Sequence, residues 1–108
     1  MHRLLILLLP LCACTNGMNP LQSTLMTPAE AAAHTERRAQ VEVFVKTNHP
    51  AIMNDIVMGG GPALTQAMQI AGIPVAQHPA RALQLQSDAG LYQSAPGALV
   101  TTLMLYAN

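Results

Sequence analysis

The sequence predicts an all-α fold: a small domain of about four to five short helices over residues 28–108, with a helical hairpin that reverses at Gly59-Gly61. Prolines stand where each of these helices would begin, and glycines or short polar segments stand where they would end. Between them, apolar residues recur at spacings of three and four, which is the helical period. The segment VEVFV at 41–45 alternates like a β-strand but has no partner strand, so a helix is favoured there.

The first helix begins at TPAE, residues 27–30. Thr27 can cap the helix, Pro28 suits its first position, and Glu30 completes a capping box. Charged side chains of mixed sign then recur every four residues, which is typical of a solvated helix face. These residues are Glu30, His34, Arg38, Glu42 and Lys46.

The apolar stripe of this helix starts late. On a helical wheel, Val41 and Val45 continue the line of the charged residues upstream, with Phe44 beside them. We therefore expect residues 28–38 to be mostly exposed and packing to begin near Arg38.

Two short helices are predicted around the glycine run. Pro50 opens the first, which carries apolar residues at core spacing: Ile52, Met53, Ile56 and Val57. Gly59, Gly60 and Gly61 form a structural turn that ends it. Pro62 opens the second, with one apolar face made by Leu64, Ala67, Met68 and Ala71. Gly72 ends this helix, and Pro74 prevents it from resuming.

Pro79 opens a fourth helix, which is expected to be interrupted near Gly90, and Pro96 opens the last. The apolar face of the last helix consists of Leu99, Val100, Leu103, Met104 and Tyr106. We expect an exposed remainder of this 99–106 face to contact a protein partner.

The N-terminus, MHRLLILLLPLCAC, has the pattern of a signal peptide. Its apolar run is too short to cross a bilayer as a helix, which needs roughly 18 residues. Cleavage before Cys14 puts Ala13 at −1 and bulky Leu11 at −3, which is poor for an ordinary signal peptidase. The segment Leu11-Cys12-Ala13-Cys14 resembles the lipobox of bacterial lipoprotein precursors. Lipidation of Cys12 would put a leucine at −1, so Cys14 is the predicted anchor.

This resemblance implies a signal peptide at 1–13, a lipidated Cys14 with a flexible tether at 14–27, and the helical domain at 28–108. It also implies diacylglycerol on the sulfur and a further acyl chain, such as palmitate, on the new amine. Two or more chains make anchoring durable. Thr15 at +2 favours the periplasmic face of the outer membrane over the inner membrane in a Gram-negative cell. A zinc or redox role for the C-x-C pair is disfavoured, because no second ligand pair and no C-x-x-C is present.

Charge and aromatic content exclude other classes of protein. From residue 14 onward there are four basic and five acidic side chains, a formal charge of −1. Such a chain cannot supply the basic surface that nucleic acids require, so no nucleic-acid partner is expected. Only Phe44, Tyr92 and Tyr106 are aromatic, which leaves little for base stacking.

From Val43 to about Tyr106, the chain is similar to a small secreted bacterial family that is known only as a domain of unknown function. The similarity rests on Phe44-Val45, Asn48, MGGGPAL at 58–64, Tyr92 and ALVTTLML at 98–105. It implies no activity and therefore no catalytic residues.

Little in the sequence points to a reaction. None of His34, His49 and His78 belongs to an H-x-x-x-H or H-E-x-x-H motif, and no G-x-S-x-G occurs, so we predict no enzyme and no cofactor. The glycine run lacks the Lys-Ser/Thr of a phosphate-binding loop. A small apolar ligand is disfavoured because a domain this short has little volume to spare.

The alternative function is periplasmic copper binding. Methionine and histidine suit Cu(I), and His49 and Met53 are four residues apart and could share a helix face. However, Met53, Met68 and Met104 fall at predicted core positions, where methionine fills irregular gaps. The prediction is therefore a lipid-anchored envelope protein of unknown process. We expect a non-enzymatic accessory or protein-interaction module, whose partner the sequence does not identify.

Overall fold

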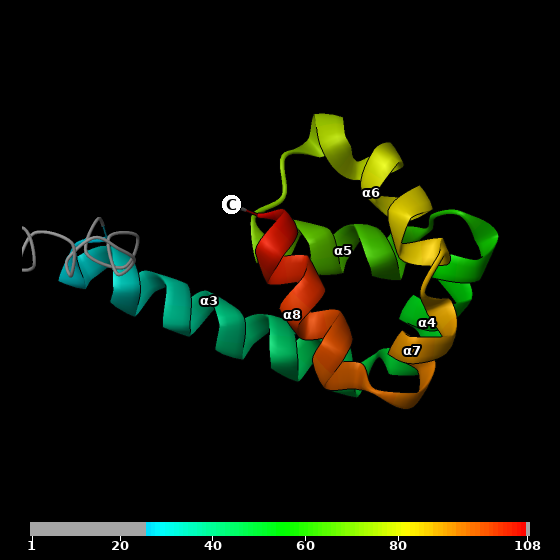
Figure 1. Cartoon of the computed structure of the whole chain (residues 1–108), viewed down its shortest axis with the longest axis horizontal. Helices are drawn as coiled ribbons and strands as arrows, with labels where there is room; N and C mark the ends of the chain where they lie inside the picture. Colours follow the sequence, from blue (N-terminus) through cyan, green and yellow to red (C-terminus); the bar gives the residue numbers. More distant parts are fainter. Residues whose placement is uncertain (1–25, 108) are drawn as a thin grey trace, which may run out of the picture. The chain divides into compact units, whose positions relative to one another are not determined.

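The computed structural model describes residues 26–107, and in this range the protein is helical with no strand. The chain divides into two compact units, residues 1–33 and 34–108, each considered by itself. The elements are α3 (Pro28–Thr47), α4 (His49–Met58), α5 (Pro62–Ala71), a 3₁₀ turn η1 (Val75–Gln77), α6 (His78–Gln86), α7 (Ala89–Ser94) and α8 (Pro96–Tyr106) (Figure 1). The all-α prediction is confirmed, and a strand at 41–45 is excluded because these residues lie inside α3.

The start of α3 is built as the sequence predicts. The Glu30 amide donates to the Thr27 hydroxyl, and the Thr27 amide donates to the Glu30 carboxylate, both over 3.0 Å. This reciprocal pair is a capping box, and it satisfies two amides that a helix start would otherwise leave without partners.

Prolines begin the other long helices. Pro62 and Pro96 are the first residues of α5 and α8, while Pro50 and Pro79 stand second in α4 and α6. The predicted fourth helix is in fact two, α6 and α7. The break lies at Ser87-Asp88 rather than at Gly90, which is inside α7. The Ser87 hydroxyl bonds the Gln84 carbonyl over 2.7 Å, so a side chain takes the place of a helical amide there.

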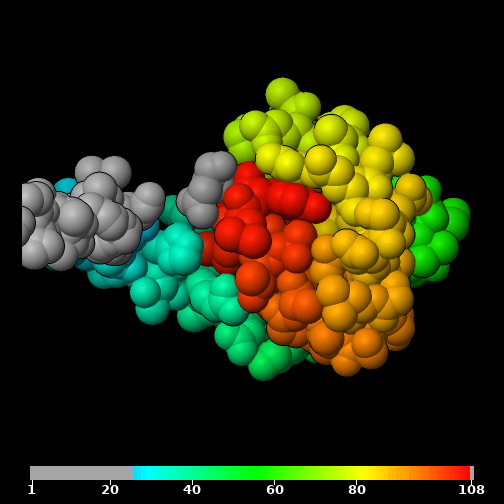
Figure 2. All heavy atoms as spheres, in the orientation of Figure 1, coloured from blue at the N-terminus to red at the C-terminus, as the bar shows by residue number. Residues whose placement is uncertain are grey.

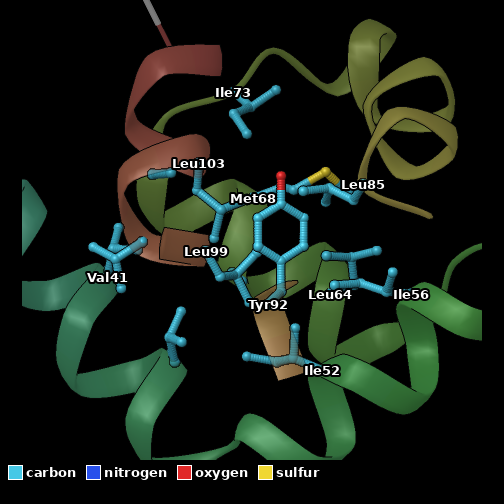
Figure 3. Packing of buried hydrophobic residues seen from close by; sticks show 14 of the residues in the cluster. Val41, Ile52, Ile56, Leu64, Met68, Ile73, Leu85, Tyr92, Leu99 and Leu103 are labelled. Carbon is cyan, nitrogen blue, oxygen red and sulfur yellow. The ribbon is translucent and has the colours of Figure 1, made fainter. Parts of the chain in front are cut away.

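One hydrophobic core holds unit 34–108 together, and all six α-helices contribute to it. In Figure 3 the ring of Tyr92 from α7 lies among side chains of α4, α5, α6 and α8. The fully buried side chains with the largest volumes are Ile52, Ile56, Leu64, Met68, Leu85, Leu99, Leu103, Val41, Val45 and Val100. Val41 and Val45 are the buried residues of α3, in agreement with the late start of its apolar stripe.

Two predicted core positions are wrong or incomplete. Val57 was predicted to be a core residue but is 66% exposed, whereas Asp55 on the same helix is buried. Tyr106 is half-buried, with the Arg81 guanidinium carbon 4.4 Å from its ring centroid.

Candidate functional site

The predicted lipidation site, Cys14, lies outside the described residues, as do the signal peptide and most of the tether. None of the helices within 26–107 is both long and apolar enough to cross a bilayer. The anchor at Cys14 therefore remains a prediction from the sequence.

The glycine run is a structural turn. Gly59 has φ 90° and ends α4 in the left-handed region. The Gly60 amide donates to the Asp55 carbonyl over 2.8 Å, and the Gly59 amide donates to the Ile56 carbonyl over 3.1 Å. This pair of bonds is a Schellman motif. Gly60 also has a positive φ, 148°, so the predicted helix stop is confirmed.

Asp55 caps the next helix across this turn. One of its carboxylate oxygens, Oδ2, accepts the amide hydrogens of Ala63 and Leu64 over 2.8 and 3.0 Å, at the start of α5. The carboxylate is buried and lies at the positive end of the helix dipole. The place where a phosphate would bind to this helix N-terminus is thus occupied by the protein's own anion.

Gly61 is required for a different reason from its neighbours. Its backbone is extended (φ 164°), which any residue adopts. A Cβ at this position would meet the Asp55 carboxylate at 2.3 Å. Sequence reasoning did not identify this contact. An aspartate among the core-spaced residues Ile52 and Ile56, shortly before three glycines, is the signal that could have revealed it.

The two histidines next to prolines hold the backbone together. Nε2 of His49 lies 2.8 Å from the Tyr92 carbonyl, and Nε2 of buried His78 lies 2.9 Å from the Ile73 carbonyl. Because a carbonyl can only accept, Nε2 carries the hydrogen in both rings. His49 thereby ties the start of α4 to α7, and His78 ties the start of α6 to the loop after α5.

The copper alternative would draw on His49 and Met53, which are the first and fifth residues of α4. Met53 is buried, and Nε2 of His49 is engaged with Tyr92, so a metal at that nitrogen would have to displace the hydrogen bond. Within residues 26–107, no group of three His, Cys, Asp or Glu side chains is placed to hold a metal ion. Met68 and Met104 are core residues, as predicted.

Most of the apolar face of α8, where a protein contact was predicted, is buried in the core. Leu99, Val100, Leu103 and Met104 are all buried, and Leu105 is the exposed large apolar side chain of this helix. Figure 2 shows the outer side of α8 at the surface, beside α6 and α7. Since α8 packs against both α5 and α7, the exposed remainder of this face is small, and the predicted protein contact there stays a prediction.

Exposed large apolar side chains occur on several elements, and one of them, Val43, lies in an open groove along α3. This groove of about 620 Å³ is lined by Glu36, Ala39, Gln40, Val43, Phe44, Thr47 and Asn48 of this helix and its end, and by Ile70 of α5. Val43 is 66% exposed and points away from the core that Val41 and Val45 enter. Half-buried Phe44 and Ile70 form one wall. A second, smaller hollow of about 240 Å³ lies between the glycine turn and His78.

Ionisable groups with shifted pKa values lie at the surface. A hydrogen bond and ion pair with Lys46, over 2.8 Å, lower the pKa of the Glu42 carboxyl. Partial burial raises the pKa of the Tyr106 hydroxyl, and nearby Tyr92 adds to the rise, while the Arg81 charge opposes it. Both shifts follow from packing and pairing between neighbours, which also occur away from functional sites.

No family model matches this chain, and comparison with characterised proteins and with solved structures likewise finds no match. The similarity to a secreted domain of unknown function therefore stays a prediction. The candidate site is defined by the α3 groove alone.

Proposed function

We propose that the protein is a lipid-anchored component of a bacterial envelope that binds a protein partner through the α3 groove and catalyses no reaction. The observation that carries the docking role is the exposure of Val43, together with exposed Ala39, on the side of α3 opposite its buried valines. An apolar stripe on a helix face fits a partner helix laid along it.

The anchor is supported by the sequence. Leu11 at −3, Ala13 at −1 and Cys14 at +1 have the spacing of a lipobox, and the segment 15–27 has the composition of a tether. Anchoring would place the helical domain near an envelope membrane, with the outer membrane favoured by Thr15.

The non-enzymatic assignment is supported by what the buried polar groups do. Asp55 and His78 are the buried polar side chains among residues 26–107, and both are bonded to backbone groups that need partners. Each has a structural task that accounts for its burial. The same holds for half-buried His49.

The anchor is tested by acyl labelling and membrane fractionation in a bacterial host. Cys14→Ser should abolish both labelling and membrane retention, while the matched variant Cys12→Ser should leave both largely intact. Mass spectrometry of the mature N-terminus gives an independent answer. A mature chain that starts before residue 14, or a free thiol at Cys14, would refute the lipoprotein assignment.

A further inference from the structure

The exposed stripe of α3, which consists of Glu36, Ala39, Val43 and Lys46, could pair with the same stripe of a second copy. Ala39 and Val43 stand two residues on either side of position 41, and Glu36 and Lys46 stand five residues on either side. If two copies of α3 lie antiparallel and cross at the level of residue 41, each Ala39 faces Val43 of the other copy. Each Glu36 then stands at the level of Lys46 of the other copy. A small side chain thus meets a larger one, and opposite charges stand together at both ends.

The side chains needed for this arrangement are accessible. Ala39, Val43 and Glu36 are exposed, and the Lys46 side chain is 58% exposed. Lys46 already pairs with Glu42 of its own helix over 2.8 Å. An ammonium has three hydrogens to donate, so a second carboxylate can join without breaking that pair.

We propose that the partner of the α3 groove is a second copy of this chain, bound antiparallel to form a symmetric dimer. The same patch then serves on both subunits, as a two-fold interface requires. This inference rests on the proposed function, because it names the partner of the proposed docking groove. The contact is small, and lipid anchoring would assist it by confining both copies to one surface and raising their effective concentration.

The test uses the full chain, expressed in a bacterial cell in two versions with different epitope tags. A photo-reactive phenylalanine analogue replaces Val43 in one version, and the matched control carries it at Leu83, which is 64% exposed on α6. Irradiation should give a product that carries both tags from position 43 and not from position 83.

The ends of the stripe are tested by charge reversal. Glu36→Lys or Lys46→Glu alone should lower the doubly tagged product by about fivefold or more, because each places like charges together twice in the dimer. The double variant restores opposite charges and should return the yield to within about twofold of the original. A merely structural role for either residue would not give this rescue.

Two outcomes overturn the inference and are distinguishable. A product at position 43 that joins one tag to a different protein excludes the self-pairing but leaves the groove as a docking surface. No product at position 43 above the control excludes both the dimer and the proposed docking role.

Discussion

Replacing Gly61 with alanine should destabilise the protein more than replacing Gly59. The new Cβ would lie 2.3 Å from both Cγ and Oδ1 of Asp55, so the carboxylate must leave its place at the start of α5. The bonds from Ala63 and Leu64 to Oδ2 would then be lost. Loss of an N-cap costs about 0.5–2 kcal/mol, and hydrogen bonds to a charged group contribute about 1.5–3 kcal/mol each. Because water can form some of the lost hydrogen bonds with the Ala63 and Leu64 amides, we expect a loss of about 2–4 kcal/mol in the free energy of unfolding.

The neighbouring glycines provide the comparison. Gly60→Ala meets no atom within 4 Å, but its φ of 148° is nearly restricted to glycine, so we expect a cost of about 1–3 kcal/mol. Gly59→Ala has 3.6 Å to the nearest atom and a left-handed φ of 90°, which should cost about 1–2 kcal/mol. For a domain of this size, about 1 kcal/mol corresponds to roughly 4–8 °C in melting temperature. Gly61→Ala should therefore melt below Gly59→Ala.

The assay is denaturation followed by circular dichroism at 222 nm, with sucrose added if a variant is too unstable to fold without it. A double-mutant cycle isolates the contact. Asp55→Ala is itself destabilising, but it makes room for a Cβ, so adding Gly61→Ala to it should cost little more. The reasoning is refuted if Gly61→Ala is no more destabilising than Gly59→Ala, or if the costs of Gly61→Ala and Asp55→Ala simply add.

Three further predictions concern the core, a tyrosine and the copper alternative. Leu99→Ala should lower the free energy of unfolding by about 2–5 kcal/mol in chemical denaturation. Its control, Leu105→Ala on the same helix, should change this free energy by less than about 0.5 kcal/mol. Equal effects of the two substitutions would contradict the burial pattern. Arg81→Gln should raise the pKa of Tyr106 further in a spectrophotometric titration, because the opposing positive charge is removed. The raised pKa stabilises the folded protein below the ordinary pKa of tyrosine, and this stability is lost as the pH rises through the pKa of the folded state. A fall in the pKa of Tyr106 would refute the assignment. Cu(I) or Zn(II) at about 100 µM should not raise the melting temperature, and a rise of several degrees that His49→Ala removes would put copper binding first.

The sequence by itself determined most of the helix starts and the helix stop at the glycine run. Thr27 and Glu30 cap α3 as predicted, Pro62 and Pro96 start their helices, and Gly59 ends α4. These signals act within about four residues of one another, so they hold whatever the rest of the chain does. The helical period also identified most of the core, including the late start of packing on α3.

Only the tertiary structure decided which side of each helix is covered. Asp55 is buried because the turn brings the amides of α5 to its carboxylate, and Val57 is left outside. Leu99, Leu103 and their neighbours on α8 are buried because α5 and α7 pack against that helix, while Val43 on α3 stays exposed. Periodicity shows that a face is apolar, but burial depends on what the fold brings against it. This is why the proposed docking surface was placed on α3, where Val43 lies on the solvent side.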